Sequence, residues 1–281
     1  MLKNNLVLGT EVFSGNWGKP FSKKIAEQIL TQAHNNGLIE IDTAPSYGNL
    51  SKVEKLIGTI SKKKSLKFKI LTKFEIKNKK NNILNYKDSV NEVKKQLDNS
   101  LKNLNTDCIE IYYFHSGTDS EFFNDEVWNY LNKRKKLGDI KKLGLSIKHD
   151  LVINDKLSQL FNAKKYGIST IQTVLNLYSK QSLKKVIPFC IKNNLEIYGR
   201  MPLAKGLLTS KYNDVNNFLK NDPRKHSAIS SDIIKFRLSK KNLDLEKVLK
   251  WPLKAVKKVV FSVKNTNQLK ELMNIFKNKK L

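Results

Sequence analysis

The chain has 281 residues, of which 40% are hydrophobic, enough for one barrel-sized domain or two small ones. Its formal net charge of +28 first suggests a nucleic-acid or anionic-membrane partner. However, only four of the 53 basic residues are arginines, whereas nucleic-acid readers favour the bidentate arginine fork. The lysines are scattered over every segment, so we expect a solvated, lysine-coated surface and no specific nucleic-acid partner.

The cysteine and hydropathy patterns indicate a reducing compartment. Cys108 and Cys190 both lie in apolar runs, which suits buried thiols better than a disulfide or a metal site. The start MLKNNLVLGT lacks the apolar core and cleavage site of a signal peptide, and no apolar run is long enough to span a bilayer. We therefore expect a cytoplasmic protein with no membrane partner and no metal.

Apolar runs alternate with helical patterns along the whole chain. A helix over 21–36, for example, is indicated by a possible cap at Ser22 and by apolar residues on one face. Strands are predicted, in chain order, over 6–10, 38–44, 68–74, 108–115, 141–147, 170–176, 196–203 and 257–263. Helices are predicted over 21–36, about 51–62, 87–104, about 121–137, 151–166, 181–194, within 231–255 and over 266–278, with a polar loop at 75–85 and an irregular basic insertion at about 205–230.

The chain thus contains eight strand-then-helix units with no linker between them, which indicates a single domain, residues 1–281. Eight such units in a chain of this length are typical of a (β/α)₈ TIM barrel. The clearest strands are continuously apolar, as buried parallel strands are. The rival is an open doubly wound sheet, but GTEVFSGN after the first strand contains no G-x-G-x-x-G turn. In a barrel, functional residues gather at the C-terminal ends of the strands, so we expect the functional residues of this chain there.

Polar residues follow three of these strands. The stretch IDTAPSYG delivers Asp42 at a strand end and Tyr47 on the loop above it. LTKF places Lys73 after a buried run, and IYYFH does the same for His115. Four such side chains are costly to bury unless they partner one another, so we expect one shared site.

Asp, Tyr, Lys and His in this order, with the IDTA..YG signature, resemble the aldo-keto reductases from about Leu8 to about Asn274. The resemblance implies that Tyr47 donates the proton when a carbonyl is reduced. Because a nearby ammonium favours the phenolate, we expect Lys73, held by Asp42, to lower the pKa of Tyr47. His115 would donate a hydrogen bond to the substrate oxygen.

Family members bind a nicotinamide cofactor without a Rossmann fold, and most use the 2′-phosphorylated form. The resemblance implies that Ser146 in LGLSI and Gln172 in IQTVLN hold the carboxamide. Arg200 stands where many members carry an aromatic residue that stacks on the nicotinamide; a guanidinium plane can also stack there, and the alternative is a salt bridge at the rim. The family's Asn after that Ser is Ile147 here. Further cofactor-binding residues are expected after the first strand and in the stretch after Arg200: Gly9, Thr10, Pro202, Leu203, Lys205 and Gly206.

The last turn, FSVKNTNQL, would take the adenosine phosphate. Asn265 and Gln268 have capping-box spacing, which makes this helix N-terminus an anion site. Lys264 matches a family Arg or Lys that pairs with the 2′-phosphate, so NADPH is preferred over NADH. The family's Gly is Ser262 here, which leaves this cofactor-binding loop fewer backbone options.

For the substrate we expect a small-molecule aldehyde or ketone. Trp17 and Phe13 lie on the first loop and are candidate pocket walls, together with His115. Few residues follow the last helix, so no long C-terminal loop is expected over the pocket; an open mouth would suit a sugar or sugar derivative. The alternative function is a non-catalytic, NADPH-binding regulatory barrel with a protein partner. We expect a monomer or weak oligomer.

Overall fold

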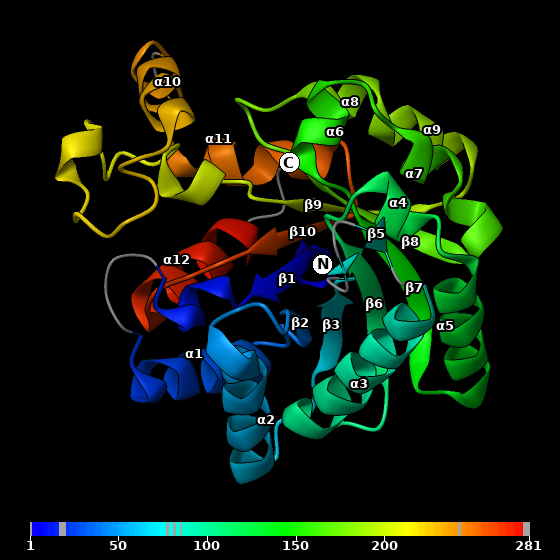
Figure 1. Ribbon diagram of the computed structural model, residues 1–281. Coiled ribbons are helices and arrows are strands. Elements are labelled where there is room, and N and C mark those ends of the chain that lie inside the picture. Colours follow the sequence, from blue (N-terminus) through cyan, green and yellow to red (C-terminus); the bar gives the residue numbers. More distant parts are fainter. Residues whose placement is uncertain are drawn as a thin grey trace.

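Eight parallel strands close into a barrel in the computed structural model, which describes residues 2–16, 21–76, 79–80, 83–84, 86–240 and 243–277 (Figure 1). The order around the barrel is β1-β10-β9-β8-β7-β6-β3-β2, and β2 returns to β1. The closed barrel confirms the TIM-barrel prediction and excludes the open sheet. The strands are β1 Leu6–Gly9, β2 Glu40–Asp42, β3 Lys69–Phe74, β6 Ile109–His115, β7 Ile140–Ser146, β8 Ile168–Val174, β9 Glu196–Arg200 and β10 Lys258–Phe261.

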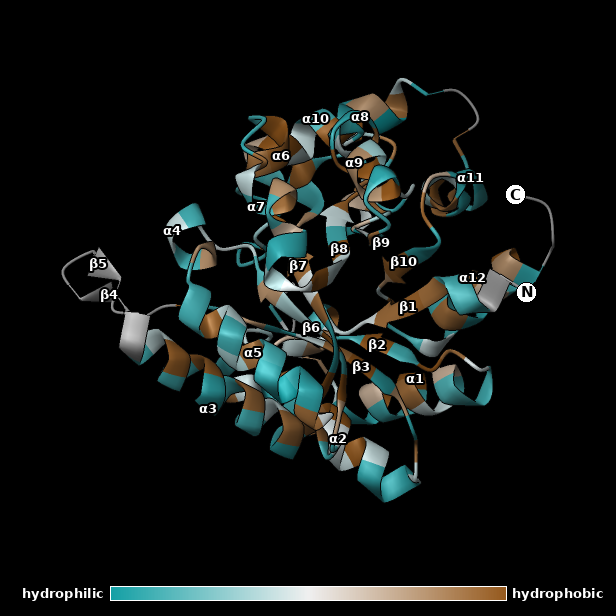
Figure 2. Ribbon diagram, turned by 90° about the vertical axis from the view of Figure 1, so that its right-hand side faces the viewer, coloured by the Kyte–Doolittle hydropathy of each residue, from teal (hydrophilic) through white to brown (hydrophobic). Residues whose placement is uncertain are grey.

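Amphipathic helices form the outer ring. In α3, Val93 and Leu97 are buried, whereas Lys94, Lys95 and Lys102 are exposed, as their spacing predicts. Figure 2 shows the resulting mixture of polar and apolar residues along α3 and α2. The long helices are α1 Lys23–Asn35, α2 Lys52–Lys64, α3 Tyr86–Leu104, α5 Asp125–Leu137, α10 Ala228–Leu238 and α12 Thr266–Lys277.

Several predicted helices are divided. A short α4, Asp119–Phe122, precedes α5, because Asn124 caps a new helix by accepting from Val127 N. Asp244 starts another helix in the same way, accepting from Lys247 N. The segments 151–166, 181–194 and 231–255 become α6 His149–Ile153, α7 Ser158–Phe161, η4 Ala163–Tyr166, α8 Gln181–Lys184, α9 Val186–Lys192, α10, α11 Leu245–Lys250 and η7 Trp251–Lys254.

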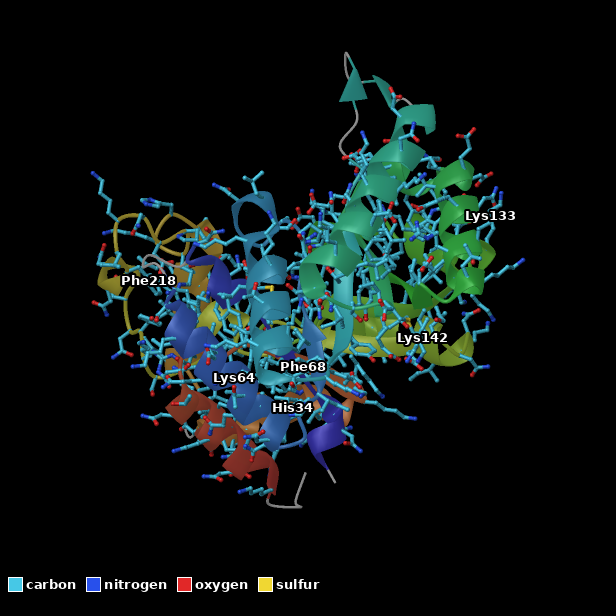
Figure 3. The ribbon with its side chains drawn as sticks, turned by 90° about the horizontal axis from the view of Figure 1, so that it is seen from below. His34, Lys64, Phe68, Lys133, Lys142 and Phe218 are labelled. Carbon is cyan, nitrogen blue, oxygen red and sulfur yellow. The ribbon has the colours of Figure 1, made fainter. Side chains whose placement is uncertain are left out.

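Smaller elements were not predicted. The expected loop 75–85 contains a two-stranded antiparallel ribbon, β4 Lys79–Lys80 and β5 Ile83–Leu84. On the outer surface, the His34 ring of α1 meets Phe68 edge-on at 5.5 Å, which joins this helix to the approach to β3 (Figure 3). The remaining short helices are η1 Leu2–Asn5, η2 Glu11–Ser14, η3 Asn49–Ser51, η5 Ala204–Gly206 and η6 Val215–Asn217.

The barrel interior has its own apolar core. Gly144 makes room for Tyr113, since a Cβ at this glycine would lie 2.3 Å from the tyrosine ring. An ion pair joins the first residues of β10 and β2, the two strands that flank β1, with 2.5 Å between Lys258 Nζ and Glu40 Oε1. The interior cluster consists of Val7, Leu71, Ile111, Tyr113, Tyr198 and Val260.

The basic insertion forms a second hydrophobic cluster beside the barrel. Figure 1 shows this segment with α10 standing out from the barrel wall near α11. Leu203 packs against both the main core and this cluster, so the insertion is anchored directly after β9. Its buried members are Ala204, Leu207, Leu208, Phe218, Ile233, Ile234 and Val248. No helix among the described residues is long and apolar enough to cross a membrane.

A buried carboxylate joins α2, β3 and α3. Glu54 is fully buried and accepts hydrogen bonds from Thr72 Oγ1 at 2.7 Å and Ser100 Oγ at 3.2 Å. Burial raises the pKa of Glu54, and the Thr72 and Ser100 hydroxyls partly oppose this. This contact holds the strand that carries Lys73 against two helices.

Glu54→Ala is expected to lower the free energy of unfolding by about 3 kcal/mol, because it leaves a cavity and two buried hydroxyls without their acceptor. Urea denaturation followed by far-UV circular dichroism measures this. The control is Lys55→Ala, at an exposed position of the same helix, where a change within about 0.5 kcal/mol is expected. Equal unfolding midpoints for the two variants would contradict the assignment.

Candidate active site

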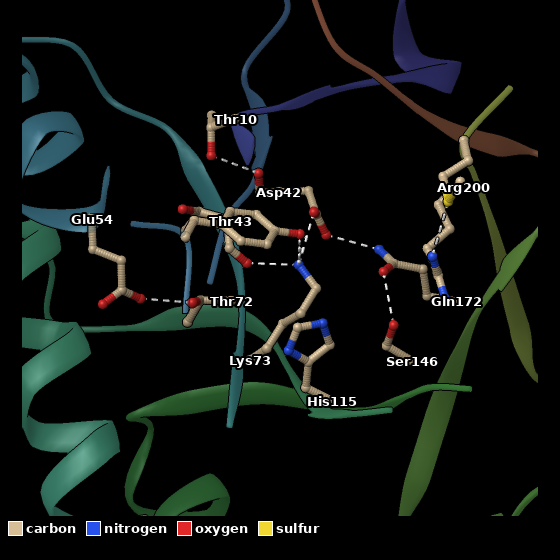
Figure 4. Close-up of polar contacts among 12 residues, drawn as sticks. Thr10, Asp42, Thr43, Glu54, Thr72, Lys73, His115, Ser146, Gln172 and Arg200 are labelled. Carbon is tan, nitrogen blue, oxygen red and sulfur yellow. Dashed lines mark hydrogen bonds and ion pairs between the residues drawn. The ribbon is translucent and has the colours of Figure 1, made fainter. Parts of the chain in front are cut away.

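Strand register brings the predicted polar residues to one end of the barrel. His115 pairs with Ser146, and Ser146 pairs with Gln172, so three adjacent strands present these side chains in one row. Gly9 pairs with Asp42 on the opposite side. Figure 4 shows the hydrogen bonds that run from Ser146 through Gln172 and Asp42 to Lys73, with His115 close by. Parallel strands that end at the same edge therefore assemble the site from distant segments.

Lys73 and Asp42 form a buried ion pair at the centre of this site. The Nζ of Lys73 lies 2.8 Å from Asp42 Oδ1 and donates to the Thr43 carbonyl at 2.7 Å. The Lys73 side chain is only 1% exposed. Burial lowers the pKa of Lys73, and the charge of Asp42 opposes this. The pair is oriented by a backbone carbonyl that accepts from the same ammonium.

Tyr47 completes the central triad. Its hydroxyl accepts from Lys73 Nζ at 3.2 Å, and Lys73 Nζ lies 4.9 Å from the ring centroid. Gly48 follows with φ of 76°, and Leu50 and Ser51 also adopt left-handed conformations, so the loop turns sharply after the tyrosine. The structure thus places Tyr47 in direct contact with the buried ion pair.

The expected lowering of the Tyr47 pKa is not found. Burial raises the pKa of the phenol well above its usual value, and the negative charges of Asp42 and Glu11 raise it further; Arg200 opposes them. Burial is the largest of these effects, and the same carboxylate that holds Lys73 also disfavours a phenolate. Tyr47 therefore keeps its proton at neutral pH, which is the state that a proton donor needs.

His115 lies beside the tyrosine, with 6.5 Å between the two ring centroids and a nearly perpendicular arrangement. Its Nδ1 lies 2.9 Å from Glu75 Oε1. Burial lowers the pKa of His115, whereas the hydrogen bond to Glu75 raises it. All four predicted catalytic residues are therefore close together.

Gln172 and Ser146 extend the network of hydrogen bonds that begins at Lys73 and Asp42. Gln172 Nε2 donates to Asp42 Oδ2 at 2.8 Å, and Gln172 Oε1 accepts from Ser146 Oγ at 3.1 Å. Thr10 Oγ1 and N both donate to the Asp42 carbonyl, which positions the end of β2 against β1. The amide and the hydroxyl each retain unused hydrogen-bonding capacity, so they can still bind a ligand amide.

Arg200 ends β9 on the other side of the site. Its Nη2 donates to the Ile147 carbonyl at 3.3 Å. The buried Nε has no hydrogen-bond partner in the described part of the chain. Burial lowers the pKa of the guanidinium, while Tyr47 and Asp42 raise it. A half-buried cation whose buried Nε has no partner among the described residues is suited to bind an anionic or polar ligand.

The stretch after Arg200 adopts a strained backbone. Ala204 and Lys205 have φ of 45° and 61°, and Gly206 has φ of 87°. Pro202 is buried, Leu203 is half-buried, and the Lys205 side chain is exposed. The N–H groups of Ala204 and Gly206 donate within this turn, to the carbonyls of Met201 and Leu203.

The turn after β10 forms the predicted helix start. Gln268 N donates to Asn265 Oδ1 at 2.9 Å, but Gln268 Oε1 accepts from Lys264 N at 2.7 Å rather than from the cap residue. A Cβ on Gly9 would lie 2.7 Å from Ser262 Oγ, so only glycine permits this close approach. Burial and the charge of Arg224 lower the pKa of Lys264.

The prediction that Phe13 lines the substrate pocket is wrong. It is buried and packs on Phe21 with 4.9 Å between ring centroids, because the first loop folds into η2 and turns the ring into the core. Trp17 lies outside the described residues.

Three charged residues of the site were missed. Glu75 is two residues beyond Lys73 at the end of β3, a spacing that could have indicated it. Glu11 directly follows the Gly9–Thr10 strand end. Arg224 had no sequence signal: it lies in the irregular insertion, is 4% exposed, and pairs with Asp222 at 2.6 Å.

Comparison with known proteins decides the family. The family model described as the aldo/keto reductase family matches residues 5–281. The chain belongs to the aldo/keto reductase family. It is 27% identical to the aldo-keto reductase YhdN of Bacillus subtilis over 224 residues, which is 78% of this chain and 64% of that protein. It is 29% identical to the Schizosaccharomyces pombe aldo-keto reductase yakc [NADP(+)] over 212 residues, 73% of this chain and 60% of that protein.

An NADH-specific methylglyoxal reductase of Escherichia coli is 27% identical over 217 residues, 72% of this chain and 64% of that protein. The matches thus span less than two thirds of the length of these curated relatives. Among solved structures, a glycerol dehydrogenase from Gluconobacter oxydans has a TM-score of 0.76 at 22% identity, covering 97% of this aldo/keto reductase and 86% of that chain. This likeness supports the fold. The described residues contain no group of three His, Cys, Asp or Glu suited to a metal ion.

Proposed function

We propose that this aldo/keto reductase is an NADPH-dependent oxidoreductase that reduces an aldehyde or ketone to an alcohol, with Tyr47 as the proton donor. The observation that carries the proposal is the contact of the half-buried Tyr47 with the buried Lys73–Asp42 pair, beside His115. A neutral phenol next to a fixed ammonium can give up its proton, and the ammonium then faces the phenolate at hydrogen-bond distance.

The other residues orient the reaction. His115 would donate a hydrogen bond to the carbonyl oxygen, and this polarises the carbonyl and favours negative charge on that oxygen. Asp42 keeps Lys73 charged and in place and, through Gln172, aligns the row that ends at Ser146. The proton moves from Tyr47 Oη to the substrate oxygen.

The chain's own residues fit a nicotinamide cofactor, which supplies a hydride when bound. The tests are the close approach that only Gly9 permits and the buried Nε of Arg200, which has no partner among the described residues. Ser146 and Gln172 would hold the carboxamide. The remaining holders would be Thr10, Arg200, Pro202, Leu203, Lys205, Gly206, Ser262, Lys264 and Gln268.

The preference for the 2′-phosphate rests on a cluster of cations. Arg224 and Lys211 both lie over the Tyr212 ring, 4.8 and 5.4 Å from its centroid, and burial, together with their charges, lowers the pKa of Lys264. Like charges held together lower the cost of binding a dianion, because the anion relieves their repulsion. The names of two relatives point in different directions, to NADP(+) and to NADH.

Lys264→Ala is expected to raise the Kd for NADPH about tenfold, the loss of one charge-assisted contact, and to leave the Kd for NADH nearly unchanged. Fluorescence titration with each cofactor measures both constants. Lys277→Ala, which removes an exposed lysine at the far end of α12, is the matched control. Equal effects of Lys264→Ala on the two cofactors would place the phosphate elsewhere.

A sugar or sugar derivative is the substrate class that we favour, because several charged side chains, Glu11, Glu75 and Arg200, act on Tyr47 and could bind hydroxyl groups. The test is NADPH oxidation at 340 nm with glyceraldehyde, dihydroxyacetone, methylglyoxal and an aldose panel. Turnover of polyhydroxylated carbonyls supports the class. No turnover with intact cofactor binding would favour the regulatory barrel with a protein partner.

We further propose a single-domain, cytoplasmic protein that binds nucleic acid only weakly. Both thiols are free, and Leu203 joins the insertion to the barrel core. At physiological salt we expect a Kd no tighter than about 10⁻⁶ M for DNA or RNA, as for nonspecific electrostatic binding. Submicromolar, sequence-selective gel shifts would contradict this. A monomer or weak oligomer stays a prediction.

A further inference from the structure

The catalytic histidine is held by a carboxylate. Glu75 Oε1 lies 2.9 Å from His115 Nδ1, and the two side chains are 24% and 21% exposed. The backbone of Glu75 is itself held by the Gln96 side chain. Glu75 N donates to Gln96 Oε1 at 3.1 Å, and Gln96 Nε2 donates to the Glu75 carbonyl at 2.7 Å. A side-chain clamp from α3 therefore sets the position of the carboxylate.

This contact restricts the protons that the ring can carry. An ionised carboxylate only accepts, so Nδ1 bears a proton when it faces ionised Glu75. In the neutral ring Nε2 is then an acceptor, and a carbonyl oxygen is also an acceptor. The described residues provide no hydrogen-bond partner for Nε2, which leaves this nitrogen for the ligand. His115 can therefore donate to a carbonyl oxygen through Nε2 only when the Glu75–His115 pair carries a second proton.

We propose that Glu75 is a positioning residue that fixes the proton of His115 on Nδ1, so that His115 donates through Nε2 only while the Glu75–His115 pair holds two protons. The proposal rests on the proposed carbonyl reduction. With two protons the pair has no net charge, and with one proton it is an anion. The second proton is retained at Nε2 while Tyr47 supplies the proton that moves to the substrate, so the pair ends the reaction in the state in which it began.

Burial and the neighbouring charges set the pH at which His115 loses this second proton. Burial lowers the pKa of His115 most strongly, and the positive charges of Lys73 and Arg200 lower it too. Glu75 raises it, through both its hydrogen bond and its charge. Reduction is therefore favoured below this pKa and is lost as the pH rises through it.

The first test is the pH dependence of kcat for carbonyl reduction by wild type and Glu75→Gln. The amide keeps the shape but removes the charge, so we expect the high-pH break to move down by about one pH unit or more. The control is Glu11→Gln, which removes another carboxylate near Tyr47 but none that contacts His115, and the break should move much less. A purely structural Glu75 would change the amount of folded protein and leave the break in place.

The second test needs no turnover. Long-range ¹H–¹⁵N spectra of the cofactor-free protein report the pKa and tautomer of each of the four histidines, with His115→Asn identifying the His115 signals. In the wild type we expect the neutral His115 ring to carry its proton on Nδ1. In Glu75→Ala we expect a shift towards the Nε2–H form that free histidine favours, while His34, His149 and His226 stay unchanged.

The outcomes separate the two proposals. An Nε2–H neutral ring in the wild type, or an unmoved pH break in an active Glu75→Gln variant, overturns the role of Glu75 and leaves carbonyl reduction standing. A wild type without carbonyl turnover overturns the proposed function, and the spectra then decide alone whether Glu75 fixes the ring. Both expected shifts together support the positioning role.

Discussion

Tyr47→Phe is expected to lower kcat by at least ~10²-fold, the low end of a general-acid contribution, with the Kd for NADPH little changed. The ring and its packing remain, and only the hydroxyl that accepts from Lys73 Nζ is lost. Steady-state kinetics with the best aldehyde of the screen measures kcat, and fluorescence titration measures Kd.

The matched control is Tyr178→Phe, which removes a phenolic hydroxyl from a half-buried tyrosine that packs on Phe236 beside the insertion. It should retain nearly all activity. If Tyr47→Phe turned over at a rate near that of the wild type, another group would have to supply the proton, and Tyr47 would leave the mechanism.

Lys73→Met is expected to damage activity as strongly as Tyr47→Phe and to destabilise the fold as well. Without the ammonium, Asp42 keeps its hydrogen bond from Gln172 but loses its counter-charge in a buried site. Leaving one member of a buried ion pair alone costs about 3 to 5 kcal/mol. Urea unfolding gives the stability, and cofactor oxidation gives the activity.

The double variant Asp42→Asn/Lys73→Met separates the two effects. It removes both charges, so we expect it to recover much of the lost stability while staying inactive. A double variant that regained turnover would show that the ammonium is not needed for catalysis. A single variant as stable as the wild type would show that the pair is not the buried contact described above.

Much of the barrel was predictable, because buried parallel strands leave continuous apolar runs and Asp42, Lys73 and His115 directly follow such runs. The helices were harder. The break between α4 and α5 depends on Asn124 as a cap inside an apparently continuous helical pattern. The separation of α10 from α11 follows from a similar cap at Asp244, within a stretch predicted as one helix.

Within the site, Asp42, Tyr47, Lys73 and His115 were predictable, but their electrostatics were not. Lys73 alone predicts a lowered pKa for Tyr47, whereas the assembled site adds burial and the charges of Asp42 and Glu11, which raise it. Arg224 could not have been predicted, because it meets Lys205 only through the path of the insertion, donating to its carbonyl at 2.9 Å. Phe13 was misplaced because a short helix rotates it into the core.

The most direct test of the central claim follows a label from cofactor to product. NADPH doubly deuterated at the nicotinamide C4 is incubated with glyceraldehyde and either wild type or Tyr47→Phe, and the product is analysed by mass spectrometry and NMR. The wild type should place one deuterium on the former carbonyl carbon, and Tyr47→Phe should do so at least ~10²-fold more slowly. Cofactor oxidation without deuterium on that carbon, or equal labelling by the two proteins, would contradict carbonyl reduction at this site.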